Sequence, residues 1–422
     1  MNKKLKIRHK IAIRLAKLTN RVLKLLGKNG EALPGFIALK LCPDILSVLT
    51  SDVKCICVTG TNGKTTTTHF IRSILEHWYP DAVMKSITGV NLPQSVVWNF
   101  IKNGDPKWKY AVIECDEDYT PVLFKSIKPD VIVVTNISED QVSRFPSVEY
   151  VRDRIVTAIA TTPDSVLCLN ANDELTMTLA EKCTNTALLF GKESETSGKL
   201  RLSWNGISKA EGEGQRFSLR SENGEFSVKL AFPGSYNAYN AMAALCACSL
   251  YRKDMASCAS MLENVQPCPS RMETMKIGGV PMRTILAKNV ASFGASIEYI
   301  TTLTKPVRIV IAQAAEIPDD MDTAWVAKVN LKKLSESKFI EKIYVTGTCA
   351  EVWEGHLYKS GFSKSDVCVI HDFDSLMNEL IKQESEVIWL PCYSESCRID
   401  KEISLWKIRK APSDNNCSFW SF

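Results

Sequence analysis

One short segment constrains the fold of this chain more than any other. Residues 53–59 (VKCICVT) form an apolar run, glycine-rich residues follow, and a helical pattern extends from Thr66 to His77. A short apolar run without alternation predicts a strand that is covered on both faces. A buried strand that turns directly into a helix is the basic unit of doubly wound α/β folds. The segment therefore predicts an α/β protein.

The turn between this strand and this helix has the composition of a phosphate-binding loop. Glycine lets backbone N–H groups approach an anion closely, and the helix N-terminus adds favourable partial charge. We expect Lys64 to contact the β- and γ-phosphates of a nucleotide and the Thr65 hydroxyl to bind Mg²⁺. The loop residues predicted to hold the nucleotide are Gly60, Thr61, Asn62, Gly63, Lys64, Thr65 and Thr66.

Polar side chains follow the later apolar runs of the chain. Glu114 ends the run at 110–114, and a carboxylate at the carboxyl end of a strand faces the crevice where α/β sheets bind ligands. Because Mg²⁺ takes one or two carboxylates together with phosphate oxygens, Glu114 is a candidate metal ligand. Asn237 and Asn240, in a helix after Gly234, are expected to contact adenine or the phosphates. Other candidates for positioning metal or substrate are Thr135, Asn136 and Asp140, and the polar residues Asn170 and Asp173 lie after the following strand.

Composition and charge exclude several classes of protein. The 422 residues suggest two or three domains, and 45% hydrophobic with 23% charged residues is typical of a globular chain. A net charge of +5 is too small to indicate a nucleic-acid partner. No apolar run reaches the roughly 18–20 residues of a transmembrane segment, and no signal-peptide pattern is present. The 15 cysteines have no disulfide spacing, which predicts the reducing cytosol.

The amino-terminal segment is basic and amphipathic. Apolar residues recur at helical spacing over residues 5–27, and basic residues fill another face. Two compatible interpretations are a helix that packs on the first domain and a helix that lies near an anionic membrane surface. The basic residues are Lys3, Lys4, Lys6, Arg8, His9, Lys10, Arg14, Lys17, Arg21, Lys24 and Lys28.

The rest of the chain predicts three parts. Residues 193–232 are rich in Gly, Ser, Glu and Lys, and a turn at 222–224 between alternating stretches predicts a small β insertion. After a hinge at Pro267 and Pro269, alternating apolar and helical segments predict a Rossmann-like α/β domain. Its strands are expected at 282–287, 307–312, 342–346, 367–370 and 387–390. The expected parts are 1–50, a basic helix and lead-in segment; 51–266, a central P-loop domain with a mostly parallel sheet; and 267–422, the carboxyl-terminal domain.

These motifs, in this order, resemble the Mur ligase superfamily. The family pattern TGTNGKT corresponds to Thr59–Thr65, and its glutamate after a strand corresponds to Glu114. Its segments TN, LNADD and G-x-[HY]-N-x-x-N correspond to Thr135-Asn136, Leu169–Asp173 and Gly234–Asn240. The matches cover residues 53–250. The resemblance implies an ATP-dependent ligase that uses ATP and Mg²⁺.

Within the superfamily the chain resembles the MurT family over nearly its whole length. Gln141 follows Asp140 at the position where amino-acid-adding members usually carry histidine. The Asp319–Trp325 segment resembles the family's DGxDxSW sequence. Further resemblances are the basic helix with Leu33–Leu41, Ser270–Glu273, Lys288-Asn289 with the helix after it, and Leu390–Ser394.

This narrower resemblance implies a specific activity. ATP would phosphorylate the α-carboxylate of D-glutamate in lipid II, and ammonia from a separate GatD-like glutaminase would attack the acyl phosphate. Lys64 and Glu114 would serve phosphoryl transfer, and Arg271 would contact the nucleotide. Asp322 would complete the glutaminase's Cys–His pair, with Asp319 as the alternative. The resemblance also implies a cytoplasmic heterodimer at the inner face of the membrane.

The sequence departs from the family in two places. MurT proteins usually carry a four-cysteine zinc ribbon in the central domain, but residues 191–245 contain no cysteine. A structural zinc site needs four ligands, so zinc is not expected. Residues 313–330 also differ from the family pattern, with Asp320 in place of Gly and Ala324 in place of Ser.

Two other functions stay open at the level of sequence. An amino-acid-adding ligase, either a Mur enzyme or a folylpolyglutamate synthetase, would bind its own amino acid and need no glutaminase. A nucleotide-binding paralogue without catalysis would explain the altered segment at 313–330. Gln141 argues against the first alternative, and intact Lys64, Thr65 and Glu114 argue against the second.

Overall fold

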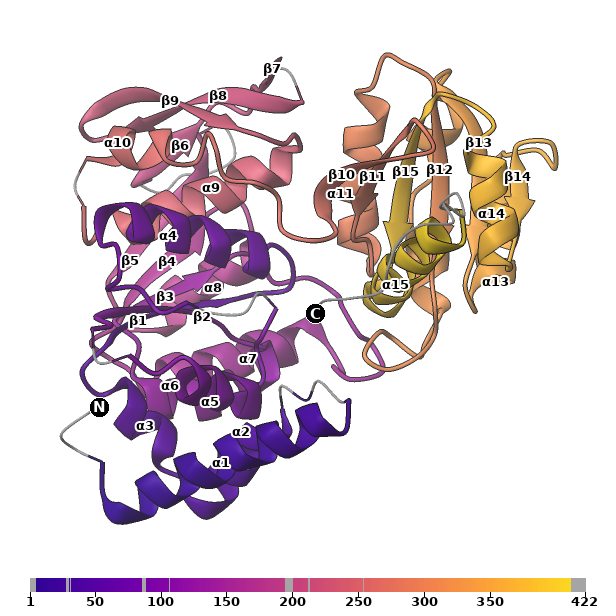
Figure 1. Cartoon of the computed structure of the whole chain (residues 1–422). Helices are drawn as coiled ribbons and strands as arrows, with labels where there is room; N and C mark the ends of the chain where they lie inside the picture. The colour runs from indigo at the N-terminus through magenta and orange to yellow at the C-terminus, as the bar shows by residue number, and fades with distance from the viewer. Residues whose placement is uncertain are drawn as a thin grey trace. The chain divides into compact units, whose positions relative to one another are not determined.

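The computed structural model describes residues 5–27, 30, 32–85, 89–105, 107–193, 200–211, 213–252 and 254–410. Lys3, Lys4 and Lys28 of the basic segment lie outside the described residues. The chain divides into two compact units (Figure 1). The first unit takes the described residues of Met1–Asp140 and Phe145–Cys268, and the second takes those of Gln141–Arg144 and Pro269–Phe422.

The first unit is built on a nine-stranded sheet with the order β2-β1-β3-β4-β5-β6-β8-β7, and β9 pairs with β8. Its elements are α1 (Ile7–Leu25), α2 (Leu33–Leu41), α3 (Ile45–Thr50), β1 (Lys54–Thr59), α4 (Lys64–Trp78), α5 (Pro93–Lys102), β2 (Tyr110–Glu114), η1 (Glu117–Tyr119), α6 (Thr120–Ile127), β3 (Val131–Val134), α7 (Val148–Ile159), β4 (Val166–Asn170), α8 (Glu174–Lys182), β5 (Ala187–Lys192), β6 (Leu202–Trp204), β7 (Lys209–Glu211), β8 (Gly214–Ser221), β9 (Gly224–Leu230), α9 (Ser235–Cys248) and α10 (Met255–Ser260).

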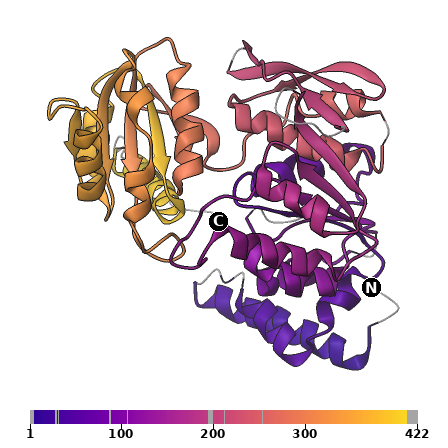
Figure 2. The ribbon, with the colours of Figure 1, turned by 180° about the vertical axis from the view of Figure 1, so that it is seen from behind.

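The strands from β2 to β6 are parallel, and helices cover both faces of the sheet. Helices α4 and α9 lie on one face, and α5, α6 and α7 lie on the other (Figures 1 and 2). Every residue of β1 after Lys54 is buried, because strands covered on both faces have no solvent side. Helix α2 packs on α5 and α1 packs on α2, so α1 forms the outermost layer of this unit.

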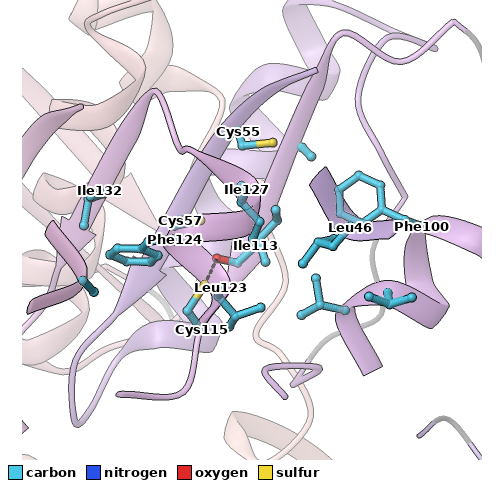
Figure 3. Close-up of a cluster of buried hydrophobic side chains, with 14 of the residues drawn as sticks. Leu46, Cys55, Cys57, Phe100, Ile113, Cys115, Leu123, Phe124, Ile127 and Ile132 are labelled. Atoms are coloured by element: carbon cyan, nitrogen blue, oxygen red, sulfur yellow. Dashed lines mark hydrogen bonds between the residues drawn. The ribbon is translucent and has the colours of Figure 1, made fainter. Parts of the chain in front are cut away.

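The core beneath β1 and β2 is apolar and rich in cysteine. Cys55, Cys57 and Cys115 are fully buried in it, and the Cys115 thiol contacts the Ile113 carbonyl oxygen at 3.8 Å. The described cysteines are all free, which agrees with thiols that act as small hydrophobic side chains. Figure 3 shows part of this cluster, with Leu46, Cys55, Cys57, Phe100, Ile113, Cys115, Leu123, Phe124, Ile127 and Ile132 labelled.

The predicted β insertion is confirmed as the antiparallel end of the same sheet. Strands β8 and β9 form a hairpin in which Ser221 pairs with Gly224. Strand β7 pairs with the opening of β8, and β6 joins the insertion to the parallel part of the sheet. The alternating burial of β8 explains why period-two sequence patterns predicted this part of the chain.

The second unit has a six-stranded sheet with the order β10-β11-β15-β12-β13-β14. All neighbours are parallel except β10 and β11. Its elements are β10 (Arg271–Ile277), β11 (Val280–Ile285), α11 (Val290–Thr301), β12 (Val307–Ala312), η3 (Ala324–Lys328), α12 (Lys332–Ser335), β13 (Ile340–Thr346), α13 (Ala350–Lys359), β14 (Val367–Val369), α14 (Phe373–Leu380), β15 (Glu386–Pro391) and α15 (Tyr393–Lys410).

The predicted fold class is confirmed. One strand was not predicted from the sequence: β10, the antiparallel edge strand of the second sheet. Among the described helices, none is long and apolar enough to cross a bilayer.

Candidate functional site

The glycine-rich segment forms a tight loop from β1 into α4. Gly60 and Gly63 adopt φ angles of +118° and +89°, which favour glycine. A Cβ on Gly60 would collide with the Thr135 hydroxyl and the Asn136 carbonyl oxygen, and a Cβ on Gly63 would collide with the Asn240 side chain. Both positions therefore require glycine for conformation and for space.

Lys64 opens α4 and turns back over this loop. Its Nζ donates to the Gly60 carbonyl oxygen at 2.6 Å and to the Thr61 carbonyl oxygen at 3.3 Å. It also forms an ion pair with Glu117 Oε1 at 2.8 Å. Burial lowers the pKa of Lys64, but the carboxylates of Glu117 and Glu114 outweigh it, so this pKa lies above its ordinary value. The ammonium is therefore held charged beside the phosphate loop.

Glu117 was not among the predicted site residues. It begins η1 three residues after Glu114, and it is buried. Burial raises the pKa of Glu117 more than the nearby Lys64 ammonium lowers it. The signal in the sequence was the acidic run after Glu114, but the pairing with Lys64 spans 53 residues and depends on the turn into η1.

Thr65 and Glu114 meet, as their predicted shared role as Mg²⁺ ligands requires. The Thr65 hydroxyl donates to Glu114 Oε1 at 3.2 Å and to Oε2 at 3.0 Å. Glu114 lies at the end of β2, next to β1 in the sheet, and both residues are buried. A hydroxyl and a carboxylate at this spacing offer hard oxygen atoms to one small cation.

The segment after β3 forms hydrogen bonds with the phosphate loop. The Thr135 hydroxyl donates to the Asn62 carbonyl oxygen at 2.7 Å, and Asn136 Nδ2 donates to the same atom at 2.8 Å. The backbone N–H of Asn62 donates to Asn136 Oδ1 at 3.1 Å. Ser138 N donates to the Thr61 hydroxyl at 2.9 Å. These residues position the loop rather than face a ligand in this arrangement.

The remaining polar candidates form a further supporting layer. Asn170 Nδ2 donates to the Thr135 carbonyl oxygen at 3.0 Å, and Asp173 caps α8 by accepting from Thr176 N at 2.7 Å. In α9, Asn240 accepts from the Thr67 hydroxyl at 3.3 Å and donates to Asn237 Oδ1 at 3.3 Å. The Asn240 side chain lies against Gly63, because a Cβ added at Gly63 would collide with it. Nucleotide contacts by Asn237 and Asn240 stay a prediction.

A small cavity borders Glu114 and Thr65. It is also lined by Thr68, His69, Arg72 and Asn99 together with Met84, Gly89, Val90, Val96 and the β2 residues Val112 and Ile113. Arg72 Nη2 lies 3.1 Å from His69 Nδ1. Burial and the neighbouring Arg72 guanidinium lower the pKa of His69 below its ordinary value. The fold therefore keeps this imidazole neutral.

The second unit carries the three acidic residues of the 319–322 segment in different surroundings. Asp319 is buried and accepts from Tyr393 N at 3.0 Å, Ser394 N at 2.7 Å and the Ser394 hydroxyl at 2.6 Å. It therefore caps α15. Asp322 is exposed, and its Oδ1 accepts from Ala324 N at 2.8 Å.

Asp320, which replaces the family's glycine, holds the segment that follows Asp140. Its carboxylate accepts from Val142 N at 2.6 Å, Ser143 N at 3.3 Å and Asp322 N at 3.1 Å. Gln141 Nε2 donates to the Pro318 carbonyl oxygen at 2.9 Å, and its backbone has a φ of +44°. Asp320 and Gln141 thus both connect residues 141–143 to residues 318–320. The altered segment is held by these hydrogen bonds.

One group of side chains near the amino terminus has the composition of a metal site. His9, Cys42 and Asp44 bring three ligand atoms within 4.8 Å of one another. The backbone N–H of Lys6 donates to His9 Nδ1 at 3.1 Å, so Nδ1 carries no proton. A neutral imidazole must then keep its proton on Nε2, which lies 3.2 Å from Asp44 Oδ2. The hydrogen bond between His9 and Asp44 connects α1 to the start of α3.

The residues around the loop fit a nucleoside triphosphate with Mg²⁺. The turn brings backbone N–H groups to the N-terminus of α4, and no side chain stands at Gly60 or Gly63. Lys64 supplies one ammonium, and Thr65 with Glu114 supplies hard oxygen ligands. Arg271 is the first residue of β10 in the second unit, and its predicted role at the nucleotide stays a prediction.

Because the pKa of His69 is lowered in the folded protein, we predict that His69 makes the free energy of unfolding depend on pH. Because the folded pKa lies below the unfolded value of about 6.5, the contribution of His69 is full above that pH and is lost as the pH falls through the folded pKa. The His69→Gln variant should lose less stability than wild type between neutral and mildly acidic pH. Urea unfolding at both pH values measures this difference, with exposed His77→Gln as control. Equal losses in wild type and His69→Gln would contradict the prediction.

Two family models match the chain. The Mur ligase middle domain matches residues 58–248, and the MurT ligase C-terminal domain matches residues 286–395. The lipid II isoglutaminyl synthase (glutamine-hydrolyzing) subunit MurT of Staphylococcus aureus is 30% identical over 378 residues, covering 81% of this chain and 85% of that protein. Its Streptococcus pneumoniae counterpart is 26% identical over 388 residues, covering 78% and 85%.

Other relatives share less of the chain or only its fold. The UDP-N-acetylmuramate–L-alanine ligase of Syntrophomonas wolfei is 28% identical over 54% of this chain and 48% of that protein. Among solved structures, MurF of Acinetobacter baumannii has a TM-score of 0.72 at 17% identity, covering 88% of this chain and 80% of that chain. The folylpolyglutamate synthase of Mycobacterium tuberculosis, complexed with ADP, has a TM-score of 0.68 at 15% identity, covering 94% and 99%.

The identity to the Staphylococcus aureus protein extends through both units, and the two family models cover the phosphate loop and strands β12 to β15 of the second unit. The resemblance drawn from the motifs is therefore confirmed. The chain belongs to the Mur ligase family of ATP-dependent ligases and carries the MurT type of carboxyl-terminal domain.

Proposed function

We propose that this chain is the ATP-dependent subunit of a glutamine-hydrolysing lipid II isoglutaminyl synthase. In this assignment residues 51–266 form the ATP-binding domain and residues 267–422 the MurT-like domain. The match of residues 286–395 to the MurT C-terminal model carries the proposal, because this domain type separates the chain from other Mur ligases, such as the alanine ligase that matches only 54% of it. The intact loop chemistry at Lys64, Thr65 and Glu114 supports catalysis rather than nucleotide binding alone.

The proposed reaction converts a carboxylate into an amide in two steps. An oxygen of the D-glutamate α-carboxylate attacks the γ-phosphorus of ATP, and the bond from that phosphorus to ADP breaks. Ammonia then attacks the carbonyl carbon of the acyl phosphate, inorganic phosphate leaves, and a proton is released from nitrogen. Phosphorylation is needed because a carboxylate is a poor electrophile, whereas phosphate is a good leaving group.

The residues of the loop have defined roles in the first step. The Lys64 ammonium and the N–H groups at the start of α4 stabilise the negative charge that spreads over the transferring phosphoryl group. Thr65 and Glu114 would hold Mg²⁺, which neutralises charge on the β- and γ-phosphate oxygens. Glu117 keeps Lys64 charged and directed toward the loop in the absence of phosphate.

Asp322 is exposed, which suits a role toward a partner protein. We assign to Asp322 the completion of the glutaminase's Cys–His pair, where an acid orients the histidine and stabilises its charged form. Its exposure supports this choice. Asp319 is the weaker candidate, because both of its carboxylate oxygens accept hydrogen bonds at the start of α15. Asp320 is engaged with the 142–143 backbone.

The first prediction of this proposal is partner-dependent amidation. The chain with a GatD-type glutaminase, ATP, Mg²⁺, glutamine and lipid II should form D-isoglutamine in the stem peptide, and mass spectrometry detects the loss of about one mass unit as OH becomes NH₂. ATP-dependent addition of an amino acid without a partner would instead identify an amino-acid-adding ligase. Absence of ATP turnover under every condition would identify a non-catalytic paralogue.

A second prediction concerns the ammonium of the loop. Lys64→Ala should reduce ATP turnover by at least about 100-fold, because it removes charge stabilisation from the transition state. It should also destabilise the fold by about 3–5 kcal/mol, since Glu117 is left buried without its cation. The double variant Lys64→Ala/Glu117→Gln should recover much of that stability but no turnover. The exposed Lys125→Ala serves as control, and full turnover by Lys64→Ala would refute the site.

A third prediction separates the acidic residues of the 319–322 segment. Asp322→Asn should reduce glutamine hydrolysis by the complex by at least about tenfold while ATP binding and the melting temperature stay unchanged. Asp319→Asn should lower the melting temperature, because it weakens the cap of α15. Glutaminase assays, calorimetric ATP titration and thermal unfolding measure these effects. An equal loss of ATP binding and glutamine hydrolysis in Asp322→Asn would count against a role toward the partner.

A further inference from the structure

Helix α1 differs from an ordinary surface helix in the side chains that it buries. Its buried residues are His9, Ala12 and Ala16, which are small or polar. Ile13 and Leu23 are partly buried, but the other large apolar side chains of α1, and that of Leu26 directly after it, are exposed, with fractions between 39% and 87%. A surface helix normally buries its bulky apolar stripe, so this arrangement needs a reason. The exposed apolar residues are Ile7, Ile11, Leu15, Leu18, Val22, Leu25 and Leu26.

These exposed side chains form one continuous stripe along the helix. They recur three or four residues apart, and such spacing places side chains on a single face. From Ile7 to Leu25 the stripe is roughly 27 Å long at 1.5 Å per residue. Helix α2, which packs beside α1, also exposes Leu33, Phe36 and Leu41. We call the six exposed apolar residues of α1, together with Leu26 directly after it, the apolar stripe.

Basic side chains follow the apolar stripe along one side. At about 100° per residue, Lys10, Arg14, Lys17 and Arg21 fall on a neighbouring face, between the stripe and the face that packs on α2. All four are exposed, as are Lys6, Arg8 and Lys24. Residues 1–30 contain no Asp or Glu. The exposed surface of α1 is therefore apolar on one face and cationic on the next.

This combination favours one kind of occupant. Two copies of α1 that met through their apolar stripes would bring their cationic rows together without acidic partners, and like charges repel. A water-soluble protein partner would have to supply both an apolar groove and an acidic rim. An anionic bilayer supplies both at once, because acyl chains lie directly beneath negatively charged headgroups.

We propose that α1 is a membrane-docking helix that lies in the plane of an anionic bilayer surface. The apolar stripe enters the boundary between headgroups and acyl chains, and the lysine and arginine side chains contact the headgroups. Since no described helix can cross a bilayer, attachment is to the surface. The proposal is independent of the proposed ligase activity, but it would bring that activity to an acceptor that carries a lipid.

The test is binding of the purified full-length chain to vesicles, measured by sedimentation. The chain should bind vesicles of phosphatidylglycerol and phosphatidylcholine at least about tenfold more tightly than vesicles of phosphatidylcholine alone, and salt should weaken binding. Two variants probe the two faces: Leu18→Gln/Val22→Gln removes part of the apolar stripe, and Lys17→Gln/Arg21→Gln removes charge. Both should lose about tenfold or more in binding to the anionic vesicles.

The matched control is Ile207→Gln/Val352→Gln, which removes two exposed apolar side chains elsewhere on the chain and should bind vesicles as wild type does. Circular dichroism and melting temperature check that each variant folds, since none of the substituted side chains is buried. Unchanged vesicle binding by the stripe variant would overturn the proposal. Absence of vesicle binding, together with a dimer that the stripe variant converts to monomer in size-exclusion chromatography, would also overturn it and identify a second copy as the occupant.

Discussion

The buried ion pair between Lys64 and Glu117 is the interaction on which the site depends. Moving an ammonium out of water is costly unless its donors find acceptors and its charge finds a partner. Lys64 meets both conditions by donating to the Gly60 and Thr61 carbonyl oxygens and pairing with Glu117. These contacts hold the loop in shape before any ligand binds. A phosphate that enters the loop meets an ammonium that is already charged, and it accepts a hydrogen bond from Nζ by replacing one of these three acceptors.

How far the sequence predicts this site depends on the distance between interacting residues. The loop follows from eight adjacent residues, Thr59–Thr66, and its flanking strand and helix follow from the patterns at 53–59 and 66–77. Glu114 follows from its place at the end of an apolar run. The contact of Asn240 with Gly63 spans a large part of the chain, and the pairing of Glu117 with Lys64 requires η1. The antiparallel edge strand β10 was missed for a different reason, because Glu273, Thr274 and Lys276 interrupt its apolar residues and leave no continuous apolar run.

The 319–322 segment shows what burial adds to a motif. The sequence places three carboxylates within four residues, and the family resemblance could only rank Asp322 ahead of Asp319. In the fold, Asp319 holds the start of α15 and Asp320 holds Val142 and Ser143, which leaves Asp322 exposed. Trp325 itself is buried against Phe293 and Trp353, so the segment is anchored at one end. Asp320 in place of glycine is therefore a substitution with its own hydrogen bonds, and the segment keeps a defined shape.

In helix α1 the periodicity of the sequence correctly predicts a helix. Periodicity alone does not show what the apolar face of that helix contacts. A repeat of three and four residues predicts an amphipathic helix, but it does not state which medium the apolar face meets. The small buried residues Ala12 and Ala16 suit close packing of α1 on α2, and Ile13 packs against the core beside them. Leucine, isoleucine and valine side chains are then available for a second apolar surface. Because the cationic row borders that surface, the residue pattern selects negatively charged lipid over bare hydrocarbon or an uncharged protein face.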